Sequence, residues 1–196
     1  MIYQLIGVIF LLSGFSHLFK LTEPWEIKIA RLVQGSFENK PWLPFFQEIW
    51  FFGRTSFAIT ILLLLTAYNW KMGLAAIVVF LIIVGIENLI KKSFTRSRPY
   101  STISEINMLQ PVEPIDPSFP SGDTLRVWYL ALILPAVAAG ENPILLIACV
   151  FLAILVSLGR MVMGVHYITD TVTGAGLGLL GAGTTIWLWN YLGIFS

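Results

Sequence analysis

The chain has 196 residues, of which 57% are hydrophobic and only 12% are charged, and its mean hydropathy is +0.81. Soluble domains carry about 25% charged residues, so this composition excludes a soluble globule and indicates a protein whose solvent is the lipid bilayer. The net charge of +1 comes without any basic tract, which excludes a protein that neutralises a series of nucleic-acid phosphates. Cys149 is the single cysteine, so an intrachain disulfide is excluded as well.

Six segments are apolar over a length close to the roughly 20 residues that a membrane-spanning helix needs. They are residues 2–19, 49–69, 72–91, 123–140, 143–163 and 168–194. The first lacks a basic start and a small-residue cleavage site, so it predicts a membrane helix rather than a cleaved leader. We therefore expect an all-α, multi-pass bundle of six transmembrane helices that forms one integral-membrane domain over residues 1–196.

The stretch between the first two apolar segments is mixed in character. Ile27, Ile29, Leu32 and Val33 alternate there with charged side chains. This pattern predicts an amphipathic helix that lies on the membrane surface after the first span.

The cationic side chains are distributed unevenly over the connections of such a bundle. With six spans, the connections after the first, third and fifth helices fall on one side of the membrane. Of the 12 Lys and Arg residues, only Lys71 falls on the other side. One face of the protein therefore gathers cations, and we expect anion chemistry at that face.

Three clusters on this face contain the residue types that bind phosphate. Lys91 and Arg98 leave the third apolar segment, Ser121 and Gly122 open the fourth, and Arg160 ends the fifth. Lysine and the planar arginine fork supply fixed positive charge and hydrogen-bond donors. A Ser-Gly turn at a helix start directs free amide groups and the positive end of the helix dipole toward an anion. Together the clusters predict a phosphate site.

His166 and Asp170 are four residues apart where the sixth segment begins, so they share one face of a helix. The carboxylate can orient the imidazole and favour its charged form after the ring attacks an electrophile. Each cluster alone has an ordinary explanation as a basic membrane flank, a turn or a structural hydrogen-bonded pair. Their coincidence on one face favours a functional site, because ionisable groups at membrane depth are costly.

The combined spacing resembles the motifs of the type 2 phosphatidic acid phosphatase superfamily. The matching pattern is Lys91, six residues, Arg98-Pro99, then Pro120-Ser121-Gly122, then Arg160, five residues, His166, three residues and Asp170. The resemblance implies a six-helix membrane enzyme, independent of metals and cofactors, that removes phosphate from a membrane lipid. The candidate substrates are a polyprenyl diphosphate such as undecaprenyl diphosphate, phosphatidic acid and phosphatidylglycerophosphate.

The resemblance also implies a role for each matching residue. The phosphoryl oxygens would be held by Lys91, Arg98, Ser121, the Gly122 amide and Arg160. His166 would attack phosphorus to form a phosphohistidine, Asp170 would orient it, and water would then release phosphate. Family members place this site outside the cytoplasm. The positive-inside rule indicates the opposite orientation, but phosphate chemistry accounts for several of the cations, so we expect an extracytoplasmic site.

Two positions depart from the superfamily pattern. Gly159 stands where a serine usually precedes Arg160, and Asp123 stands where a histidine protonates the leaving oxygen. Three interpretations of Asp123 remain open. It replaces the histidine as the acid, or the substrate is a lipid diphosphate whose leaving group needs little acid help. In the third interpretation the site is impaired, either naturally, in a protein that binds lipid phosphate without turnover, or by an engineered change. A lipid phosphotransferase is a further alternative.

Overall fold

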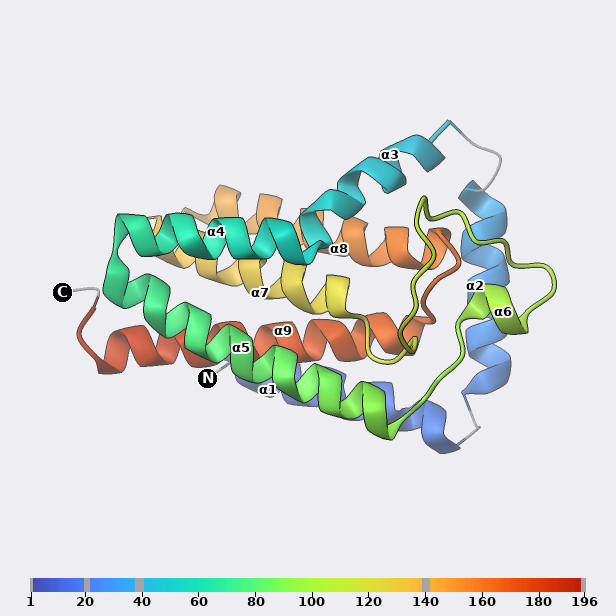
Figure 1. Ribbon diagram of the computed structural model, residues 1–196, viewed down its shortest axis with the longest axis horizontal. Helices are drawn as coiled ribbons and strands as arrows, with labels where there is room; N and C mark the ends of the chain where they lie inside the picture. Colours follow the sequence, from blue (N-terminus) through green and yellow to red (C-terminus); the bar gives the residue numbers. More distant parts are fainter. Residues whose placement is uncertain (1, 20–21, 38–40, 139–141, 195–196) are drawn as a thin grey trace.

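The computed structural model describes residues 2–19, 22–37, 41–138 and 142–194. Over these residues the chain forms helices joined by turns and irregular segments, and they contain no β-strand (Figure 1). The elements are α1 (Ile2–Gly14), the 3₁₀ helix η1 (Phe15–Phe19), α2 (Glu23–Phe37), α3 (Leu43–Ile49), the 3₁₀ helix η2 (Trp50–Gly53), α4 (Thr55–Tyr68), α5 (Trp70–Ser93), α6 (Pro99–Thr102), α7 (Gly122–Val137), α8 (Pro143–Val162) and α9 (Ile168–Tyr191). The predicted all-α class is confirmed.

The six predicted apolar segments correspond closely to α1 with η1, η2 with α4, and α5, α7, α8 and α9. The last two residues of the expected 123–140 segment lie outside the described residues. By length and composition, α5, α8 and α9 can each cross a membrane alone. The stretch from α3 through η2, followed by α4, qualifies as one span that is bent by 46°, and α1 is a shorter apolar helix.

Two asparagines explain where long helices of the bundle begin. The Asn69 side-chain oxygen accepts hydrogen bonds from the amides of Lys71 (3.1 Å) and Met72 (3.3 Å) at the start of α5. Asn142 caps α8 in the same way, and Pro143 occupies its first position. An N-cap side chain satisfies amides that have no acceptor within the helix, and proline is tolerated where no such bond is lost.

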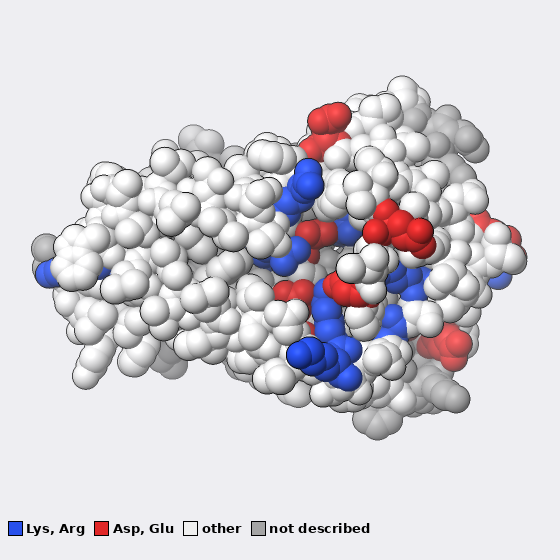
Figure 2. Space-filling view, viewed as in Figure 1, with Lys and Arg blue, Asp and Glu red and all other residues white. Residues whose placement is uncertain are grey.

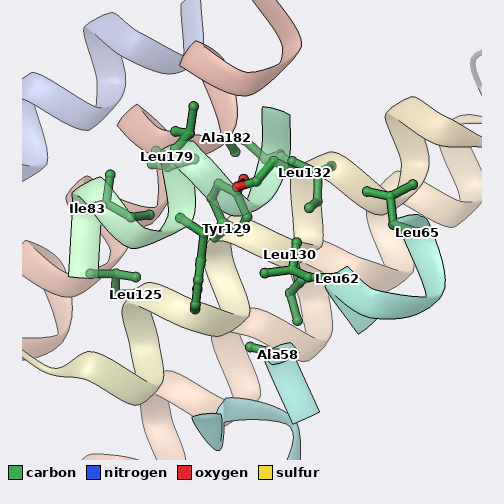
Figure 3. Packing of buried hydrophobic residues seen from close by; sticks show 14 of the residues in the cluster. Ala58, Leu62, Leu65, Ile83, Leu125, Tyr129, Leu130, Leu132, Leu179 and Ala182 are labelled. Atoms are coloured by element: carbon green, nitrogen blue, oxygen red, sulfur yellow. Dashed lines mark hydrogen bonds between the residues drawn. The ribbon is translucent and has the colours of Figure 1, made fainter. Parts of the chain in front are cut away.

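The hydrophobic core joins α4, α5, α7 and α9 (Figure 3). Tyr129 of α7 lies at its centre and is fully buried. Its hydroxyl donates to the Ala76 carbonyl of α5 (2.8 Å) and lies 2.8 Å from the Thr185 hydroxyl of α9. The tyrosine therefore ties three helices together without leaving its polar atom unpaired.

α9 packs against its neighbours by close approach of the backbones. A side chain at Gly174 or Gly178 would collide with the carbonyl oxygen of Ser121 or Leu125 on the α7 side. In addition, the Ser121 amide donates to the Asp170 carbonyl oxygen (3.0 Å). Small residues permit this approach, and it fixes the start of α7 beside the start of α9.

α2 lies across one end of the bundle, nearly perpendicular to the long helices (Figure 1). Its buried side consists of Glu26, Ala30 and Gln34, whereas Trp25 and Leu32 are exposed. Two of the three buried side chains of α2, those of Glu26 and Gln34, are therefore polar. Of the aliphatic residues in the sequence pattern, Ile27 and Val33 are partly buried against apolar clusters, whereas Leu32 is exposed.

The same end of the molecule carries the long irregular segment between α6 and α7 and most of the visible charged side chains (Figure 2). The other end is almost free of charge in this view. The expected asymmetry of charge is therefore present in the fold.

Candidate active site

All eight residues expected to form the site lie at this charged end. Lys91 is in the last turn of α5, Arg98 precedes α6, and Ser121 caps α7. Gly122 and Asp123 form the first turn of α7, Arg160 the last turn of α8 and Asp170 the first turn of α9, with His166 in the short link before it. Four helix ends and two links thus bring the three sequence clusters together.

A cavity of about 480 Å³ opens between them. Six of the expected residues line it: Lys91, Arg98, Gly122, Asp123, Arg160 and His166. The rest of its lining comes from the irregular segment and from Trp50, Arg54 and Arg126. The volume suits a phosphorylated headgroup at the low end of the range for ligand pockets.

One wall of the cavity contains Lys91 and Arg98. The Lys91 ammonium contacts Glu87 (3.1 Å), four residues earlier on α5, and is hydrogen-bonded to Asp116. The Arg98 guanidinium donates to the other Asp116 oxygen (2.8 Å) and to the Val165 carbonyl (2.8 Å). Asp116 thus pairs with both cations. Burial alone would raise the pKa of its carboxyl, but Lys91 and Arg98 hold that pKa below its usual value. The sequence did not single out this counter-ion.

The opposite wall contains Arg160, which is buried. Its Nη2 contacts Asp123 (3.0 Å), and its guanidinium lies 5.2 Å from the centre of the Trp50 ring. Its Nε and Nη1 atoms are buried without a hydrogen-bond partner among the described residues. Buried donors without acceptors are rare in folded proteins, so this guanidinium has two donors available for an anion in the cavity.

Asp123 is surrounded by donors. It accepts from Arg126 Nη2 (2.6 Å) and Trp50 Nε1 (3.1 Å), in addition to its ion pair with Arg160. Protonation of this carboxyl would break two ion pairs at once, so the geometry favours a permanent anion. Nothing in the local sequence pattern indicated Trp50 of η2 as a partner of Asp123.

His166 is buried between the two walls. Its Nδ1 lies 3.5 Å from Asp170 Oδ2, and its Nε2 lies 3.4 Å from Arg98 Nη1. A carboxylate can only accept, so we assign the Nδ1 proton to the Asp170 side, which leaves the lone pair on Nε2. Burial lowers the pKa of His166 to about 4, and the guanidiniums of Arg98 and Arg160 act in the same direction. The ring is therefore neutral at pH 7, as a nucleophile must be.

Ser121 and Gly122 differ in how they meet the cavity. The Ser121 hydroxyl is buried and accepts from the amide (3.4 Å) and hydroxyl (3.0 Å) of Thr124, which makes it the N-cap of α7. Gly122 lines the cavity, and a side chain there would collide with Glu87. Its amide belongs to the first turn, where amides have no acceptor within the helix. Gly122 is thus better placed than the Ser121 hydroxyl to meet an anion.

Within the described residues, no group of three or more His, Cys, Asp or Glu side chains is arranged to hold a metal ion. The carboxylates of the cavity are instead paired with Lys and Arg.

Comparisons with known proteins agree with this arrangement. The model of the PAP2 superfamily matches residues 70–194, which is more than half of the chain. An undecaprenyl-diphosphatase from Sulfolobus acidocaldarius is 31% identical over 120 residues. That alignment covers 61% of this chain and 56% of the relative, so the chain matches little more than half of that protein.

Two solved structures have the same fold. A transmembrane PAP2-type phosphatidylglycerolphosphate phosphatase from Bacillus subtilis has a TM-score of 0.83 at 20% identity, covering 98% of both chains. LpxE from Aquifex aeolicus has a TM-score of 0.71 at 23% identity, covering 82% of this chain and 93% of its own. With the apolar helices described above, these likenesses identify an integral membrane protein. The match over α5 to α9 and the motifs within it show that the chain belongs to the PAP2 superfamily.

Proposed function

We propose that the chain hydrolyses a phosphate group from a membrane lipid through a phosphohistidine on His166. Arg160 carries this proposal, because its two unpaired buried donors line the same cavity as the neutral imidazole. Phosphoryl transfer is catalysed mainly by positioning and by stabilising charge on the transferred group. A cavity that offers a nucleophile and unused cationic donors is suited to both tasks.

The reaction proceeds in two displacements. His166 Nε2 attacks phosphorus, and the bond between phosphorus and the leaving oxygen breaks. Arg160, Arg98, Lys91 and the Gly122 amide hold the phosphoryl oxygens. Water then attacks the phosphohistidine, the P–N bond breaks, inorganic phosphate leaves, and His166 is restored. No step requires a metal ion or another cofactor.

Asp123 bears on the class of substrate. A carboxylate held by Arg126, Arg160 and Trp50 has no proton to give to a leaving group. A lipid alkoxide needs such a proton, whereas a lipid phosphate that leaves from a diphosphate does not. We therefore propose a lipid diphosphate, and the name of the Sulfolobus relative points to a polyprenyl chain.

The membrane arrangement belongs to the same proposal. We propose one domain with six spans, supported by the six helical segments at the expected positions. α2 lies at the membrane interface, supported by its exposed Trp25 and Leu32. The cavity opens on the extracytoplasmic side, as the family resemblance implies.

The first test measures phosphate release by the detergent-solubilised protein with a chelator present. The substrates are a polyprenyl diphosphate, the matching monophosphate, phosphatidic acid and phosphatidylglycerophosphate. General acid catalysis contributes about 10²–10⁴-fold, so we expect the diphosphate to exceed the monoesters by a factor of that size. Equal rates on all four lipids would contradict the leaving-group argument.

The nucleophile is tested with His166→Ala and a diphosphate labelled in its terminal phosphate. We expect the wild-type protein to give an acid-labile, alkali-stable phosphoprotein and the variant to give none. Turnover by the variant should fall below about a hundredth of wild type, because removal of a nucleophile costs several orders of magnitude. Residual turnover above that level in a folded variant would exclude the phosphohistidine route.

A further inference from the structure

A second, largely buried group of charges contacts Asp170 and does not line the cavity. Arg96 Nη1 donates to Asp170 Oδ1 (2.7 Å), and Arg96 Nη2 donates to Glu26 Oε2 (2.6 Å). Glu26 lies on α2 and is only 2% exposed. Arg96 therefore bridges Asp170, a carboxylate of the site, to Glu26, which lies 70 residues before Arg96 in the chain.

The bridge is reinforced by its neighbours. The Thr169 hydroxyl accepts from Arg96 Nη1 (2.8 Å) and donates to Glu26. The Arg96 guanidinium also stacks on the Tyr167 ring, 4.0 Å from its centre. A planar guanidinium held at both donor pairs and on its face has a single orientation.

This orientation determines how Asp170 meets His166. Oδ1 of Asp170 is taken by Arg96, so Oδ2 faces the Ser118 hydroxyl, the Tyr167 amide (2.8 Å) and His166 Nδ1 (3.5 Å). Without Arg96, Oδ1 loses its charged donor, and only the neutral Ser118 hydroxyl and Tyr167 amide, both on Oδ2, still hold the carboxylate beside the imidazole. The negative charge of Asp170 is also no longer offset by Arg96.

We propose that Arg96 and Glu26 are positioning residues that act through Asp170 to set the orientation and proton affinity of His166. The expected effect on turnover rests on the proposed phosphatase function, whereas the expected effect on the pKa of His166 does not. The proposal gives the buried Glu26 of α2 a role beyond anchoring the helix.

Other contacts already anchor α2. The Gln34 amide donates to the Asn107 carbonyl (2.7 Å) and accepts from the Asn107 amide (2.7 Å). Arg31 pairs with Glu105 at 3.1 Å, with both side chains more than half exposed. The Arg31–Glu105 pair joins the same helix to the same irregular segment without touching Asp170, so it supplies a matched control.

The expected effect on His166 follows from the charges that face it. These are Arg98 before α6, Asp123 on α7, Arg160 on α8 and Asp170 on α9. Loss of Arg96 leaves the Asp170 charge less compensated, so His166 binds a proton more readily and its pKa rises. Loss of the Glu26 charge acts in the opposite sense, because Asp170 alone then balances Arg96.

The test is to titrate the His166 ring in detergent micelles and to monitor its protonation by nitrogen NMR. The chain has two histidines, so a His17→Asn background leaves one signal. We expect Arg96→Met to raise the midpoint by about one pH unit or more, the scale of a nearby charge. Glu26→Gln should leave the midpoint at or below its original value, and Glu105→Gln should not move it. An unchanged midpoint in Arg96→Met, or equal shifts in all three variants, would overturn the proposal.

Two further measurements keep the proposal testable if this variant does not fold or if the protein is inactive. If Arg96→Met alone fails to fold, the Glu26→Gln/Arg96→Met double variant is titrated instead, because it leaves neither partner of the Arg96–Glu26 pair charged. Its midpoint should lie above that of Glu26→Gln, since the two proteins differ only in Arg96, and equal midpoints would overturn the proposal. In turnover assays we expect a loss of about 10–100-fold in kcat with little change in KM, as for partners that orient metal-bound histidines. An inactive wild-type protein would refute the proposed function alone, since the titration does not depend on turnover.

Discussion

The two walls of the cavity hold their cations in different ways. Lys91 and Arg98 share the counter-ion Asp116, whose side chain is 47% exposed and lies on the irregular segment between α6 and α7. Arg160 is paired with Asp123, whose side chain is 13% exposed and lies in the first turn of α7. One counter-ion is half exposed on a segment without regular structure, whereas the other is held in a helix by two further donors.

This difference assigns distinct tasks to the two walls. A phosphoryl group that enters on the first wall must displace Asp116. On the second wall the charge stays balanced, and the group meets donors that have no other partner. The first wall therefore regulates how readily an anion binds, and the second supplies contacts that strengthen as charge develops in the transition state.

The largest effect should come from Arg160→Lys. An ammonium keeps the charge but cannot offer a fork to two oxygens, and loss of one transition-state donor costs about 10²–10³-fold. We expect a fall of that size in kcat/KM for phosphate release. Arg98→Lys should also lower kcat/KM, by about tenfold. The effect is smaller because backbone carbonyls already accept hydrogen bonds from the Nε and Nη1 atoms of Arg98.

Arg54→Lys is the matched control for these two variants. Arg54 lines the cavity and is exposed, with its guanidinium 5.1 Å from the centre of the Trp50 ring. We expect it to stay close to wild type. Full activity in Arg160→Lys or Arg98→Lys would place that arginine outside the phosphate clamp.

Substitutions of Asp123 test whether the wall that contains Arg160 lacks a general acid. Asp123→His restores the superfamily residue, and we expect it to raise monophosphate turnover about tenfold or more, within the range of general acid catalysis. Diphosphate turnover should change less, so the ratio of the two initial rates narrows. Asp123→Asn should retain diphosphate turnover to within a few-fold, since little proton donation is needed there.

Two results would revise this interpretation of Asp123. Equal loss of both reactions in Asp123→Asn would make the carboxyl an acid or an essential structural group. Activity on both lipids only after Asp123→His would identify the present sequence as an impaired member of the family.

The smallest effect is expected at the half-exposed counter-ion. Partly exposed ion pairs are worth up to about 1 kcal/mol, which corresponds to about fivefold in affinity. Asp116→Asn should therefore lower the inhibition constant of inorganic phosphate by about that factor. Glu113→Gln, which changes another carboxylate of the same segment, is the control. An unchanged constant would mean that Asp116 does not compete with the anion.

The sequence was sufficient for features that depend on local pattern. Apolar length located the helices of the bundle. Motif spacing identified residues that converge at one end of the fold. Each of these signals repeats with the period of a helix or lies within one segment.

The partners of those residues could not be found in this way. Trp50 and Asp123 are 73 residues apart and Glu26 and Arg96 are 70 apart, so only the packing of helices brings each pair together. α2 illustrates the same limit. Its aliphatic residues suggested a surface helix, but the four-residue steps from Glu26 to Ala30 and Gln34 marked the buried side. The sequence indicated this buried side only by the polar residues Glu26 and Gln34 at its two ends.

The pairing of α1 with α9 has a consequence for biosynthesis. Both buried residues of α1 are glycines, and Gly7 meets the α9 backbone at Gly176 and Leu180 so closely that a side chain would collide. α1 is synthesised before α2 to α8, so it meets this partner only after those helices have been made. Contacts that are distant in sequence form late, and Asp170 lies in the first turn of α9. A nascent chain that stops before α9 thus contains most of the cation clamp but neither closes its bundle nor orients its nucleophile.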